Sequence, residues 1–196
     1  RVNNNRLQSI PIEIGLLENL TILDLHNNRL SSIPSEIGQL NHLFELNLEN
    51  NNLTTLPIEI ESLSNLNIIN IQSNKISDIP DCIWKLKQLE VLLIGSNNIL
   101  EISADIKELN KLMVFDISNN KISYLPPEIG YLSNLEELAL HRNGLTKLPL
   151  EMCNLLQLSR VTLHYNRLVD IPIEIIKLSN YWNLDSIEQL NVDQLL

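Results

Sequence analysis

Residues 20–42 read LTILDLHNNRLSSIPSEIGQLNH, and the same apolar pattern returns every 23 residues along the chain. An asparagine marks each copy without an insertion or deletion, at Asn5, Asn28, Asn51, Asn74, Asn97, Asn120, Asn143 and Asn166. A constant period of this length means that one supersecondary unit is stacked on copies of itself. The sequence therefore predicts an elongated solenoid of eight repeats over residues 1–180, the first one incomplete at its N-terminus.

The first half of each repeat predicts a short β-strand. In Leu23-Asp24-Leu25, apolar and polar residues alternate, which is typical of a strand with one buried face. The repeated asparagine follows where the chain turns away, and its amide can both donate and accept hydrogen bonds. We expect these eight asparagines to be structural, because they can satisfy backbone groups that no regular ladder reaches.

The second half of each repeat predicts a short helix or turn on the outer side. Proline begins this half in seven of the eight copies, as in Pro34, and pre-sets a helical φ. An acidic residue such as Glu36 follows two positions later, where a carboxylate complements a helix dipole. We interpret this acidic column as a solvated convex stripe, which offers no cleft for acid–base catalysis.

The consensus of the copies, LxxLxLxxNxLxxIPxEIxxLxN, resembles the leucine-rich repeat. Its outer half is similar to intracellular repeats of the Ras-binding scaffold (Sur-8/Shoc2-like), Erbin and Scribble groups, and to repeats of Roco proteins and bacterial effectors. The resemblance implies an α/β solenoid that is curved, with a parallel sheet on the concave side and short helices or turns on the convex side. It also implies a protein partner, such as a small GTPase or another signalling protein.

Composition narrows the classes of function. The chain has 196 residues, is 44% hydrophobic and carries a net charge of −10, which argues against nucleic acid as a partner. Its apolar runs are only a few residues long, so we expect no membrane insertion. Its two cysteines, Cys82 and Cys153, lie three repeats apart, too far to pair. This favours a reducing, cytoplasmic location, with a secreted bacterial effector as the alternative.

The two ends of the chain differ. Residues 181–196 contain a capping box at Asp185–Glu188 and scattered apolar residues, which predict a C-terminal capping helix. At the N-terminus the pattern begins inside a strand, so we expect a fragment of a longer protein. The uncovered N-terminal face is expected to self-associate, or to be covered by upstream repeats, through four apolar residues: Val2, Leu7, Ile10 and Leu17.

Binding specificity in a solenoid depends on the strand positions that the consensus leaves free. In repeats four to six these positions are apolar, with Ile68, Val91, Leu93 and Val114, while Gly95 is expected to leave a bare spot. In repeats seven and eight they are basic and aromatic. The simpler alternative is that β-branched residues merely favour strands. We predict a partner-binding patch with this apolar centre and a polar side made of Asp116, His141, Arg160, His164 and Tyr165.

The sequence carries no signature of an enzyme or of a cofactor site. It contains neither a phosphate-binding glycine loop nor a nucleophile elbow. His141 and His164 occupy equivalent positions in adjacent repeats, but two ligands without a third make a poor zinc site. We therefore expect an interaction module without catalysis, cofactor or metal. The alternative is a sensor or regulatory segment of a larger signalling enzyme or secreted effector, for example a kinase, GTPase or ubiquitin ligase.

Overall fold

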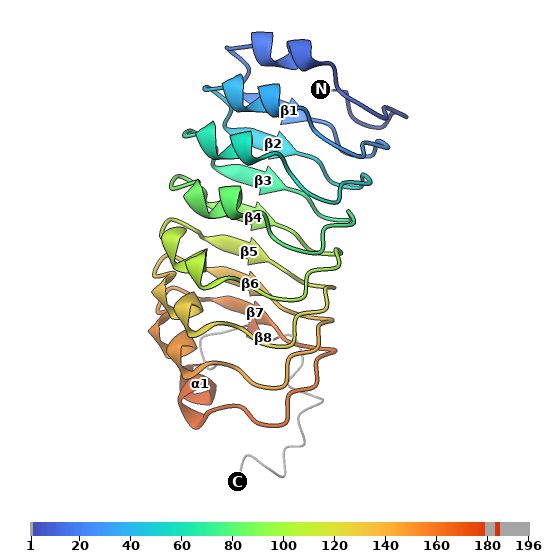
Figure 1. The fold of residues 1–196 in the computed structure, drawn as a ribbon. Coiled ribbons are helices and arrows are strands. Elements are labelled where there is room, and N and C mark those ends of the chain that lie inside the picture. The colour runs from blue at the N-terminus through green and yellow to red at the C-terminus, as the bar shows by residue number, and fades with distance from the viewer. Residues whose placement is uncertain (1, 179–182, 185–196) are drawn as a thin grey trace.

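The computed structural model describes residues 2–178 and 183–184, and its chain winds into a stack of similar coils (Figure 1). Eight short strands form one parallel sheet in sequence order. They are β1 (Ile22–Asp24), β2 (Glu45–Asn47), β3 (Ile68–Asn70), β4 (Val91–Leu93), β5 (Val114–Asp116), β6 (Glu137–Ala139), β7 (Arg160–Thr162) and β8 (Asn183–Leu184). Each residue of one strand pairs with the residue 23 positions later, so equivalent positions of the repeats form straight columns. The predicted α/β solenoid is confirmed.

Short helical turns occupy the opposite side of each coil (Figure 1). Seven are 3-10 helices: η1 (Ile12–Leu16), η2 (Ser35–Gln39), η3 (Ile58–Ser62), η4 (Asp81–Lys85), η5 (Ala104–Glu108), η6 (Pro127–Tyr131) and η7 (Leu150–Asn154). The eighth is an α-helix, α1 (Ile173–Leu178). The capping helix predicted over residues 181–196 lies outside the described residues, apart from the two that pair with β7 as strand β8.

The prolines stand one position earlier than the sequence suggests. We expected proline to be the first helical residue, but Pro34 is the N-cap of η2, with φ −68° and an extended ψ of 150°. Its carbonyl accepts the first turn's hydrogen bond from Ile37 N–H at 3.2 Å. In the fifth repeat, Ser103 takes this position and its hydroxyl accepts from Asp105 N–H. A serine can therefore replace the proline, because the position requires an extended residue that ends the preceding segment.

The core is one continuous column of leucine and isoleucine side chains between the sheet and the turns. Residues from β1 to α1 contribute to it, and most are fully buried. A single repeat has no second layer of its own, so each coil buries its apolar side chains against the coils before and after it.

The repeated asparagines join adjacent coils. Asn97 is buried, and its Oδ1 accepts a hydrogen bond from Ile76 N–H of the preceding repeat at 3.0 Å. Its Nδ2 donates to Ile71 O of the preceding repeat and to Ile94 O of its own, both at 3.0 Å. The equivalent asparagines from Asn28 to Asn166 repeat the bond to the backbone N–H of the preceding coil.

The convex side of η4 differs from that of the other repeats. Cys82 takes the place of the usual acidic residue and Trp84 that of glycine, and both side chains are buried at 2% exposure. The acidic column has no member at η4, where these larger, less polar groups pack inward. Burial is the main cause that raises the pKa of the Cys82 thiol to about 11. This keeps the thiol protonated and unreactive at neutral pH.

Glycines in the convex turns permit close approach of neighbouring coils. A Cβ at Gly38 would lie 2.5 Å from Glu59 O of the next coil, whereas a Cβ at Gly144 would meet nothing closer than 3.5 Å. We expect Gly38→Ala to lower the free energy of unfolding by about 1–3 kcal/mol, since backbone has to move apart. Gly144→Ala is the matched control, expected to be neutral or stabilising. Equal effects of the two replacements in urea unfolding would contradict this explanation.

Candidate protein-binding surface

The four apolar residues predicted as the binding centre lie together on the sheet. Ile68, Val91 and Val114 pair in register on β3, β4 and β5, and Leu93 lies two residues further along β4. They are half-buried rather than freely exposed. In-register neighbours about 4.8 Å away cover part of each side chain. The result is a continuous apolar surface across three strands of the face opposite the helical turns.

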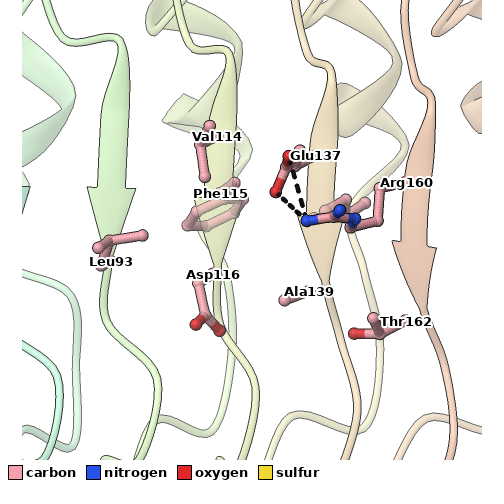
Figure 2. A pocket seen from close by; sticks show the side chains of 9 residues that line it. Leu93, Val114, Phe115, Asp116, Glu137, Ala139, Arg160 and Thr162 are labelled. Atoms are coloured by element: carbon pink, nitrogen blue, oxygen red, sulfur yellow. Dashed lines mark hydrogen bonds and ion pairs between the residues drawn. The ribbon is translucent and has the colours of Figure 1, made fainter.

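The predicted polar side divides into separate contacts. Asp116 lies on β5 and Arg160 on β7, where the Arg160 guanidinium pairs with Glu137 of β6 at 3.2 Å (Figure 2). His141 and His164 follow β6 and β7, and their rings stack with centroids 4.6 Å apart. The His164 ring also meets Tyr165 edge-on at 5.2 Å. The histidines and the tyrosine thus form one cluster. Arg160 instead forms an ion pair with Glu137, which was not among the predicted residues.

Gly95 does not leave the bare spot that we expected. Gln72 reaches across from the end of β3, and its Nε2 donates to Asp116 Oδ2 at 2.7 Å. A Cβ at Gly95 would lie 3.0 Å from Asp116 Oδ1 and 3.2 Å from Gln72 Nε2. The absent side chain therefore makes room for this bridge. Asp116 Oδ1 also accepts from Ser118 N–H at 2.9 Å, so the carboxylate is held at both oxygens.

The sequence did not lead us to predict that one residue of each repeat has a positive φ. The residue before each repeated asparagine has φ between 53° and 58°, a region that asparagine adopts more easily than most residues. Six members of the column are small polar residues: Asn4, Asn27, Asn50, Ser73, Ser96 and Asn119. The last two are Arg142 and Tyr165, with the Arg142 guanidinium 5.3 Å from the centre of the Tyr165 ring. The frequent Asn-Asn pairs in the sequence were the signal for this column.

A second apolar area of the surface, apart from the predicted patch, was not predicted from the sequence. Ile22 and Phe44 are 37% and 44% exposed, at the side of the sheet where β1 and β2 begin. With Thr21, His42 and Asn67 they line a shallow hollow of about 510 Å³. Phe44 precedes its strand, so the alternation that assigns strand residues to faces does not apply to it. Its exposure follows only from the path of the chain.

The N-terminal face carries exposed apolar side chains among the described residues. Val2 is 47% exposed, Leu7 37% and Leu17 51%, while Ile10 packs partly against the core. Self-association through this face stays a prediction.

The histidine cluster predicts a pH dependence of stability. Burial is the main cause that lowers the pKa of His141, with further lowering by His164 and Arg142 against an opposing effect of Asp116. The unfolded state then takes up a proton at higher pH than the folded state does. Stability should fall as pH drops below about 6.5 towards the folded pKa. His141→Gln should remove this part of the pH dependence in urea unfolding, whereas the exposed control His42→Gln should not.

The described residues lack two further features. They contain no group of three or more histidine, cysteine or acidic side chains arranged to hold a metal. None of their helices combines the length and the hydrophobicity needed to span a lipid bilayer.

Comparison with known proteins identifies the repeat. Residues 1–53, 45–99 and 87–145 match the model of the leucine rich repeat family. A comparison with curated protein sequences finds no match. Among solved structures, a leucine-rich repeat protein of Leptospira interrogans is 36% identical with a TM-score of 0.88, and the match covers 92% of this chain and 46% of that chain.

Two plant receptors have similar structures. The peptide hormone receptor RGFR1, solved in complex with RGF2, is 26% identical with a TM-score of 0.71, over 93% of this chain and 34% of that chain. The ectodomain of the Arabidopsis thaliana receptor kinase GASSHO1/SCHENGEN3, in complex with CASPARIAN STRIP INTEGRITY FACTOR 2, is 32% identical with a TM-score of 0.71. That match covers 93% of this chain and 26% of that chain. The chain thus spans less than half the length of each of these structures, and its period, its sheet and the matched family model assign it to the leucine-rich repeat family.

Proposed function

We propose that the chain is a protein–protein interaction module that binds a partner protein on its concave sheet and carries out no catalysis. The observation that supports this most strongly is the apolar patch of Ile68, Val91, Leu93 and Val114. Partner surfaces need an apolar area that loses water on binding, bordered by polar groups that fix orientation. The polar border here is formed by Asp116, His141, Arg160, His164 and Tyr165.

The similar structures support this function by analogy. Two of them are receptors solved in complex with named protein or peptide partners. A fold by itself does not fix a function, so the proposal depends on the patch rather than on the fold.

An intracellular scaffold role is the finer proposal. The resemblance of the outer half-repeat to Ras-binding scaffolds suggests a small GTPase or another signalling protein as the partner. Cys82 and Cys153 are unpaired thiols in the described part of the chain, which supports a reducing, cytoplasmic location. A secreted effector remains the alternative location.

A second candidate function is the sensor or regulatory part of a larger signalling enzyme or effector. The observation that favours it is that one similar structure is the ectodomain of a receptor kinase. The concave patch would then recognise the signal, while another part of the protein would carry the activity.

The proposed function is tested by one replacement in the patch. Leu93→Glu puts a charge into the apolar centre and should weaken partner binding at least about tenfold, since that carboxylate would lose water without gaining a counter-ion. Glu59→Lys on η3 is the control and should leave binding unchanged. Proteins retained by each immobilised variant from an extract of the source organism are compared quantitatively, with circular dichroism to verify folding. Loss with Glu59→Lys but not with Leu93→Glu would assign binding to the outer face.

A further inference from the structure

A hollow of about 170 Å³ lies in the concave sheet over Ala139 (Figure 2). It exists because Ala139 is small, while its in-register neighbours Asp116 and Thr162 have larger side chains. Leu93 and Val114 add apolar walls. The hollow therefore borders directly on the apolar patch, and its lining is mostly apolar with polar groups at the margin.

The margin of this hollow is already ordered. The Asp116 carboxylate is held by Gln72 at 2.7 Å and by the backbone of Ser118 at 2.9 Å. On the next strands, Glu137 and Arg160 pair at 3.2 Å. A pocket whose polar border is fixed before binding loses little conformational entropy when a side chain enters.

Arg142 and Tyr165 each follow a lining residue of the hollow, Ala139 and Thr162, by three positions, in a conformation that suits neither of them. Both have positive φ, at 56° and 58°, where the other repeats use asparagine or serine. Every repeat has this backbone conformation, and asparagine adopts it more easily than arginine or tyrosine does, so the choice of these two residues costs stability. Burial does not offset this, because Arg142 is exposed and Tyr165 is 58% exposed. The Arg142 guanidinium contacts the Tyr165 ring at 5.3 Å, but this contact leaves its positive charge without an acidic partner among the described residues.

The histidine pair connects the hollow with Arg142. His141 Nδ1 hydrogen-bonds Thr162 Oγ1 at 2.8 Å, and Thr162 lines the hollow. Among the described residues, no hydrogen bond occupies His141 Nε2. Within the described residues Arg142 forms no salt bridge, although the chain has a net charge of −10. An unneutralised arginine beside two histidines favours a negatively charged group of the partner.

Resting on the proposed function, we infer that the partner presents an extended segment with two anchors. An apolar side chain of the segment fills the hollow over Ala139. An acidic side chain of the same segment binds Arg142 and His141. Arg142 follows Ala139 by three residues, so the two subsites lie roughly 7–10 Å apart at about 3.4 Å per residue. This separation corresponds to two or three residues of an extended partner.

A library of short random peptides panned against the immobilised wild-type chain tests this inference. Enriched peptides should carry Leu, Ile, Met or Phe with Asp or Glu two or three positions away. Ala139→Leu fills the hollow and should weaken these peptides at least about tenfold, whereas Ala139→Ser keeps the space and should not. Arg142→Asn should weaken them about three- to tenfold, and less at high salt.

Thermal unfolding separates a binding role from a structural one. Asparagine adopts positive φ more easily than arginine does, so Arg142→Asn should keep or raise the melting temperature while it weakens peptide binding. A fall in melting temperature together with unchanged binding would make Arg142 a structural residue and overturn the inference.

The remaining outcomes distinguish this inference from the proposed function. Peptides that tolerate Ala139→Leu and Arg142→Asn but are lost with Leu93→Glu would overturn the two-anchor segment and leave concave binding intact. Peptides insensitive to all three replacements would count against both. No enrichment on the wild-type chain would overturn recognition of a single segment, while the Leu93→Glu comparison would still test the proposed function.

Discussion

Replacing Asn74 and Asn97 together by alanine is expected to destabilise the protein by more than the sum of the two single replacements. Each asparagine is the acceptor for one backbone N–H of the preceding repeat, that of Leu53 and that of Ile76 respectively. A single replacement leaves that N–H without its partner, which should cost about 1–3 kcal/mol.

The destabilisation beyond the sum of the single replacements arises at one carbonyl to which both asparagines donate. Ile71 O accepts from Asn74 Nδ2 at 3.1 Å and from Asn97 Nδ2 at 3.0 Å, and among the described residues no other donor contacts it. Either asparagine alone satisfies this oxygen, but the double replacement leaves it unpaired. We therefore expect about 1–3 kcal/mol beyond additivity, measured as a double-mutant cycle in urea unfolding.

A second pair provides the control for this cycle. Asn97 and Asn143 bind different carbonyls, so their replacements should add within about 0.5 kcal/mol. Asn110→Ala removes the same side-chain type from an exposed position and should have little effect. Additivity of the Asn74 and Asn97 replacements would show that adjacent repeats are not joined through shared carbonyls.

Phe115→Ala is expected to give the largest loss from a single replacement, about 3–5 kcal/mol. Phe115 is fully buried on β5, in register with Leu92 and Leu138. Removing its ring leaves a cavity that the rigid repeat spacing cannot close, since the coils on both sides are fixed by the sheet.

Phe115→Leu is the matched variant for this prediction. The other strands carry leucine, isoleucine or valine at the same position, so a leucine side chain fits the spacing of the coils. We expect it to retain most of the stability that Phe115→Ala loses. Similar losses for the two variants in urea unfolding would mean that the aromatic ring, rather than filled volume, is required at this position.

The sequence by itself determined the repeat, the sheet and the backbone role available to the asparagines. These properties depend on period, alternation and the hydrogen-bonding capacity of one side chain, which are local to each 23-residue copy. A constant period also places equivalent residues in columns, so the sequence alone predicted that Ile68, Val91 and Val114 are neighbours. The proximity of His141 and His164 followed from the same columns, whereas the stacking of their rings did not.

Only the tertiary structure decided how side chains on different strands use the space between them. Gln72 hydrogen-bonds Asp116 over Gly95, and Arg160 forms an ion pair with Glu137. Each of these side chains has several polar groups within reach, and the packing around it determines which one it contacts. The hollow over Ala139 likewise depends on the size and direction of its neighbours across four strands. The strain at Arg142 and Tyr165 came from backbone dihedral angles that the path of the chain imposes on every repeat alike. Such competition among neighbours is settled by packing in three dimensions, which the periodic pattern of one repeat does not contain.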